Sequence, residues 1–130
     1  MGAALLVAGC SGSKPRPVGP YRPAGPPQNA VQREIDAAAG LPFERDRREL
    51  LEAVAVRSVL GPVDQVRLID AAIDRLPSDE DLQIVLLALA GNPALTQVAV
   101  LHIQARRDDI THPHVRIRVM QAIGGGEPEF

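Results

Sequence analysis

The residues best suited to chemistry lie in the stretch Asp108–His114, with His102 about two helical turns earlier. Imidazole and carboxylate groups this close in sequence could bind Zn²⁺ or another divalent metal, with His102, Asp109, His112 and His114 as the ligands. However, His112 and His114 flank a proline, and no HExxH-like spacing places two ligands on one helical face. We therefore favour a solvated loop with a helix-capping residue over a metal site, and expect no cofactor.

Other signatures of catalysis are absent from the sequence. There is no GxSxG motif for a serine nucleophile, and the single cysteine lies far from the histidines. A phosphate-binding glycine loop would open a helix, whereas Gly124-Gly125-Gly126 follows one. The net charge of −2 gives no reason to expect nucleic-acid binding. We expect a protein that is not an enzyme.

The single cysteine, Cys10, excludes an internal disulfide and a cysteine-rich zinc site. The uncharged stretch before it ends in small residues, as secretory signal peptides do before their cleavage site. The residues Val7-Ala8-Gly9-Cys10 resemble the lipobox of bacterial lipoproteins. The resemblance implies signal cleavage after Gly9, a diacylglycerol group on the thiol of Cys10, and a location on the extracytoplasmic face of a bacterial membrane.

One feature departs from that family, because no Lys or Arg precedes Cys10. A complete signal peptide begins with a cationic segment and carries about 7–15 apolar residues. We therefore interpret residues 1–9 as the remnant of a signal peptide that starts upstream. The alternative is an ordinary N-terminus with an incidental cysteine.

Residues 10–28 are predicted to be a lipidated cysteine followed by a disordered, proline-rich linker. Six of the 12 prolines fall in this stretch, which shows no apolar periodicity. Proline fixes φ and removes a hydrogen-bond donor, so we expect an extended tether without helix or strand. At ~3.1 Å per residue, the tether would hold a domain up to about 50 Å from its anchor.

The helical domain is predicted over residues 29–124, followed by a disordered tail at 125–130. Apolar residues recur with helical spacing, and no segment alternates with the period of a strand, so the fold class is all-α with five to six short helices. The expected helices span residues 29–39, 44–58, 62–76, 79–90, 93–105 and 113–123. The fourth is apolar nearly all round and should be the most buried. Phe43, Leu50, Val98 and Leu101 are expected to face the core.

The prolines indicate a repeat. Pro42 and Pro77 are 35 residues apart, and Pro77 and Pro113 are 36 apart, a spacing typical of stacked helical hairpins. Residues 112–124 resemble the second half of a HEAT-type repeat, with a Pro, then Val-Arg, then spaced apolar residues closing on a Gly. The alternative is a compact helical bundle without true repeats. Arg116 and Arg118 are expected to pair with acids on a neighbouring helix.

These observations predict a lipid-anchored cell-envelope protein whose small helical domain has an interaction or scaffolding role. Its partners would be the membrane, through lipidated Cys10, and an unidentified protein. The alternative function is a metal-binding or enzymatic helical module that uses the Asp108–His114 cluster.

Overall fold

A computed structural model describes residues 20–124 of the chain. These residues contain no strand, so the all-α prediction is confirmed. The elements are α2 (Ala30–Ala39), α3 (Glu44–Ala55), α4 (Pro62–Arg75), α5 (Asp79–Ala90), α6 (Gln97–Ala105), a short 3-10 turn η1 (Arg107–Asp109) and α7 (Pro113–Ala122). The predictions for residues 1–19 and 125–130 lie outside the described part.

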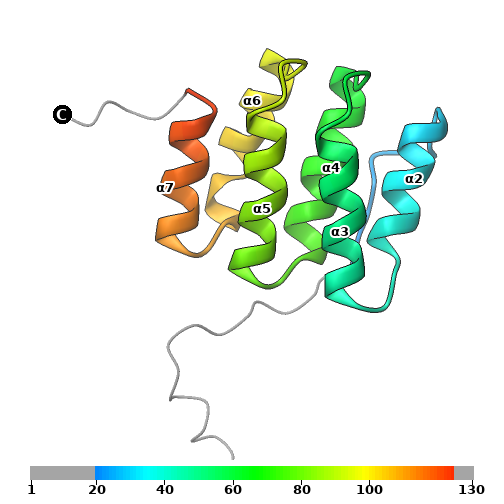
Figure 1. The fold of residues 1–130 in the computed structure, drawn as a ribbon, viewed down its shortest axis with the longest axis horizontal. Helices are drawn as coiled ribbons and strands as arrows, with labels where there is room; N and C mark the ends of the chain where they lie inside the picture. The colour runs from blue at the N-terminus through cyan, green and yellow to red at the C-terminus, as the bar shows by residue number, and fades with distance from the viewer. Residues whose placement is uncertain (1–19, 125–130) are drawn as a thin grey trace, which may run out of the picture.

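The helices form three antiparallel hairpins that stack side by side in two layers (Figure 1). The first helices of the hairpins, α2, α4 and α6, make one layer, and the second helices, α3, α5 and α7, make the other. Each helix packs on its counterpart in the next hairpin, so α4 and α5 are covered on both sides. The first end of the stack is formed by α2 and α3, and the last end by α6 and α7.

Local capping accounts for where most of the helices begin. The side chains of Asn29, Ser78, Thr96 and His112 each accept a hydrogen bond from a backbone N–H in the first turn of the helix that follows. Pro62 and Pro113 occupy first helical positions, where no N–H is needed. These starts match the predicted ones, except at α6.

Two predicted helix boundaries are wrong. The second helix ends at Ala55 rather than Ser58. The fifth begins at Gln97 rather than at the proline four residues earlier, because side chains from other helices and loops hold the intervening turn. The Gln65 side-chain carbonyl accepts hydrogen bonds from the N–H and the hydroxyl of Thr96, each 2.9 Å long. Asn92 donates to the carbonyls of Ala55 and Arg57.

The core runs through all three hairpins, and α5 contributes four side chains with no exposed surface: Leu82, Val85, Leu86 and Leu89. The predicted burial of Phe43, Leu50, Val98 and Leu101 is wrong, since each is about half exposed or more. On α6 the buried side chains are instead Ala99 and Ile103. Because α6 is apolar nearly all round, periodicity could not show which stripe faces inward.

An internal repeat relates the first two hairpins. The pattern Arg-x-Ile-Asp-Ala-Ala occurs at residues 33–38 of α2 and again at 67–72 of α4, 34 residues later. In the second layer, the guanidinium groups of Arg47 and Arg116 each donate to a carbonyl six residues earlier, at Leu41 and Ile110. Equivalent residues in successive hairpins are therefore 34 or 35 positions apart, close to the spacing of the prolines.

Candidate interaction surface

The structure does not assemble the predicted metal ligands. The ring of His102 lies 2.7 Å from the carboxylate of Asp70, and Asp109 accepts a hydrogen bond from Arg106. His112 caps α7, and its ring centroid lies 5.3 Å from that of His114. Among residues 20–124, no group of three or more His, Cys, Asp or Glu side chains is arranged to hold a metal ion.

His102 belongs to an ionic cluster between α4 and α6. Arg106 donates to Asp70, Asp74 and Asp109 over 2.9–3.0 Å. Burial by itself would lower the pKa of Arg106, but the hydrogen bonds to Asp74, Asp70 and Asp109 raise it above its usual range. The guanidinium is therefore permanently charged and ties α6 to α4.

The sequence predicted that Arg116 and Arg118 pair with acids on a neighbouring helix, but within residues 20–124 Arg116 binds a backbone carbonyl and Arg118 forms no ion pair. The guanidinium of Arg116 donates to the carbonyl of Ile110 at 2.9 Å, within its own hairpin. This bond closes the loop before α7 and is a structural contact.

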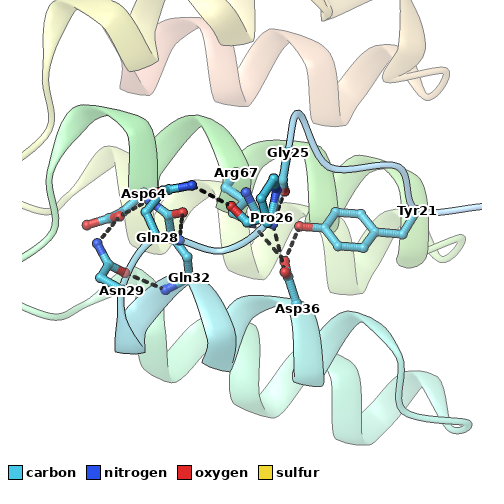
Figure 2. A network of polar contacts seen from close by, with 9 residues as sticks. All are labelled: Tyr21, Gly25, Pro26, Gln28, Asn29, Gln32, Asp36, Asp64 and Arg67. Carbon is cyan, nitrogen blue, oxygen red and sulfur yellow. Dashed lines mark hydrogen bonds and ion pairs between the residues drawn. The ribbon is translucent and has the colours of Figure 1, made fainter.

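A second polar network joins α2, α4 and the segment before them, residues 20–28, which we call the strap (Figure 2). Arg67 is 6% exposed. It donates from Nε and Nη2 to the two carboxylate oxygens of Asp36, 2.8 and 2.7 Å away. Its Nη2 also donates to the carbonyl of Gly25 at 2.7 Å. The hydroxyl of Tyr21 donates to Asp36 at 2.8 Å. The strap is thus bound to both helices.

The contacts of this network shift the pKa of Asp36 downward and the pKa of Tyr21 upward. The Arg67 hydrogen bond, followed by that of Tyr21, lowers the pKa of Asp36 despite partial burial. Burial of the phenol, followed by its hydrogen bond to Asp36, raises the pKa of Tyr21 above its ordinary value of 10.0. The network is most stable with Asp36 ionised and Tyr21 neutral.

Asp64 organises the neighbouring contact at the start of both helices (Figure 2). Its carboxylate accepts hydrogen bonds from the side chains of Gln32 and Asn29, 2.8 and 3.1 Å long, and from the N–H of Gly61. Burial alone would raise the pKa of Asp64, but these three hydrogen bonds together lower it. The strap, α2 and α4 are therefore joined by hydrogen bonds at two places along the helices.

The strap differs from the prediction for this part of the chain. Residues 20–28 contain no helix or strand, as expected, yet they lie against α2 and α4 and do not act as a spacer. Tyr21, Asp36 and Arg67 are not among the site residues that the sequence predicts. The repeated Arg-x-Ile-Asp pattern is the signal that would have pointed to Asp36 and Arg67.

The first end of the stack carries an apolar groove between α2 and α3. Its floor is formed by small and aliphatic side chains: Ala37, Leu50, Ala53 and Val54. Glu34 and Arg57 complete its lining and form an ion pair with each other. The cavity volume is about 270 Å³, and Leu50 is 49% exposed. This groove can accept aliphatic side chains from another molecule.

The last end of the stack is apolar as well. Val98 and Leu101 lie three residues apart on α6 and therefore on one face, and Ile117 lies on α7. Each of the three is more than half exposed. Exposed aliphatic side chains thus occur at both ends, whereas the central hairpin contributes one such residue, Val63.

Gly9 and Cys10 lie outside the described residues, so the lipidation prediction stays a prediction. None of the helices in residues 20–124 is long and apolar enough to span a bilayer. Comparison of the chain with protein-family models, with curated protein sequences and with solved structures finds no match in any of the three.

Proposed function

We propose that this chain is a lipid-anchored protein of the bacterial cell envelope, and that its helical domain binds a protein partner without catalysing a reaction. The proposed anchor is Cys10, on the strength of the lipobox-like sequence before it. The observation that carries the binding role is the apolar groove between α2 and α3, whose aliphatic floor is open to solvent among the described residues.

The strap changes the reach of the proposed tether. Because residues 20–28 are bound to the helices, only residues 11–19 separate Cys10 from the strap. At ~3.1 Å per residue, this segment spans at most about 28 Å. A partner of the groove would therefore be another envelope component close to the membrane surface.

The anchor is tested by growing cells that express the full chain with its natural upstream sequence in the presence of a labelled fatty acid. Label should enter the protein and disappear on Cys10→Ser, which removes the acylated thiol but leaves the small residues before it. Label that persists in Cys10→Ser would contradict the anchor.

The binding role is tested with a photo-crosslinking amino acid placed at Leu50, in the groove, and in a matched strain at Val63, on the central hairpin. Both positions are exposed, by 49% and 63%. Crosslinking in intact cells should yield a defined adduct from position 50 and none from position 63. Equal yields at both sites, or no adduct at position 50, would refute a groove-specific partner.

A further inference from the structure

Residues that line the groove at the first end have buried counterparts on the next hairpin. Ala37 corresponds to Ala71, 34 residues later, and Leu50 and Val54 correspond to Val85 and Leu89, 35 residues later. Ala71, Val85 and Leu89 have no exposed surface, because α2 and α3 pack against α4 and α5. The groove on α2 and α3 is therefore equivalent to the surface of α4 and α5 that the first hairpin covers.

The exposed residues of the last end are also repeat positions. Leu101 corresponds to Val66, and Ile117 to Gln83. Val66 and Gln83 are less exposed than Leu101 and Ile117, since α6 and α7 pack beside them. The chain thus contains the same contact between neighbouring hairpins twice. Its first and last ends expose the two surfaces that would form a third contact of this kind.

The ion pairs between neighbouring hairpins are not continued at the two ends of the stack. Arg33 on α2 corresponds to Arg67, which binds an acid of the preceding hairpin. The acid that Arg67 binds is Asp36, whose counterpart on α4 is Asp70 and on α6 is Gln104 or Ala105, so the last end has no acid at that place. In the other layer, Asp46 corresponds to Asp81, an acid that lies 3.6 Å from Arg48 of the preceding hairpin.

The counterpart of Arg48 on α7 is Ile117, and the exposed cation Arg118 follows it directly. The match between the two ends is therefore apolar, through Ile117 and the aliphatic lining of the groove.

We infer that the partner of the groove is a second copy of this chain, docked so that its α2–α3 end packs on the α6–α7 end of the first. The inference rests on the proposed binding role of the groove. The contact continues the hairpin stack across molecules, with Leu101 and Ile117 of one copy against the groove of the next. It joins two different surfaces, so it adds copies head to tail.

The test uses the full chain carrying Cys10→Ser, so that no disulfide can link copies. Leu50→Glu blocks the first end, Leu101→Glu blocks the last end, and Val63→Glu places the same charge on the central hairpin as a control. Circular dichroism and thermal melts show that each variant is folded. Sedimentation velocity is then recorded up to about 200 µM, where a Kd near ~100 µM still populates dimers.

The unblocked chain and Val63→Glu should at least double their weight-average mass over this range. Leu50→Glu and Leu101→Glu should each stay monomeric alone. Their equimolar mixture should form dimers and nothing larger, because the intact last end of one variant fits the intact first end of the other. A like-with-like contact predicts that only one variant loses assembly and that mixing restores nothing.

An unblocked chain that stays monomeric, or a mixture that stays monomeric, would overturn the inference. Either result leaves the proposed function standing if position 50 still crosslinks in cells, since the adduct would then contain a different protein. An adduct whose mass is twice that of the chain, from position 50 to residues of α6 or α7, would identify the second copy directly.

Discussion

Asp36 on α2 and Asp70 on α4 occupy the same place in successive hairpins, 34 residues apart, and each accepts hydrogen bonds from the following helix. Asp36 is bound by Arg67 and covered by the strap through Tyr21. Asp70 is bound by His102 and Arg106, and no strap residue is bonded to it. One position in the repeat thus serves two different polar contacts.

The two contacts share an acid on the earlier helix and differ in the groups that bind it. Both contacts need an acid on the earlier helix and a cation on the later one, which joins helices of the same layer. Arg67 also holds the strap, because its second Nη2 hydrogen bond reaches the carbonyl of Gly25. Arg106 instead collects three carboxylates. Asp36 therefore has a single guanidinium partner on α4, whereas Asp70 has two partners on and after α6, the ring of His102 and Arg106, that can replace each other in part.

The largest expected effect comes from the apolar core beneath both contacts. The loss of stability should be the same at the two sites. Ile69→Ala on α4 and Ile103→Ala on α6 each remove a fully buried side chain. Each should lower the free energy of unfolding by about 3 kcal/mol, from lost burial and the cavity that is left. Urea unfolding followed by circular dichroism measures it. A cost below about 1 kcal/mol at either site would show that the stack is not one continuous core.

The next effect should distinguish the two contacts. Arg67→Ala leaves Asp36 partly buried without its cation and releases the strap, so it should cost about 2 kcal/mol. His102→Ala leaves Asp70 paired with Arg106 and should cost about 0.5 kcal/mol. The same urea experiment measures both. Equal costs would contradict the dependence of the first contact on a single guanidinium.

The Asp36–Arg67 pair should also give the protein an acid-sensitive contact. Asp36→Asn should cost about 1 kcal/mol at neutral pH. Because the folded pKa of Asp36 is lowered, its contribution is complete above the unfolded value of 3.8 and is lost as pH falls through the folded pKa. The difference in the free energy of unfolding between the original chain and Asp36→Asn should therefore disappear below about pH 4. A difference that stays constant from neutral pH to acid would contradict the lowered pKa.

The smallest effect concerns the strap alone. Tyr21→Phe removes one hydrogen bond to Asp36 and should cost about 0.5–1 kcal/mol. The folded pKa of Tyr21 is raised above 10.0, so this contribution is present below pH 10.0 and is lost as pH rises further. Tyr21 is the only tyrosine, and the chain has no tryptophan. Its absorbance therefore reports the phenol directly, and a titration at the ordinary value of free tyrosine would show that the strap is detached.

The helices could be predicted from the sequence because the interactions that start and stop them are local. Ser78 and Asn29 cap helices through backbone groups three residues away, and Pro62 and Pro113 suit first helical positions. The start of α6 was misplaced because Gln65, 31 residues earlier in the chain, holds Thr96 as the cap. The prediction that α5 is the most buried helix is wrong, because α4 has eight buried residues and α5 has four.

The sequence by itself determined that this protein is a set of short helices with a regular spacing of 34 to 36 residues, and it suggested an attachment point at Cys10. Only the tertiary structure decided that Leu50 and Leu101 lie at open ends, that the predicted metal ligands bind other partners, and that the strap is held by Asp36 and Arg67. The physical reason is distance along the chain. Helix formation depends on neighbours within about one turn, whereas exposure and ion pairing depend on packing between hairpins.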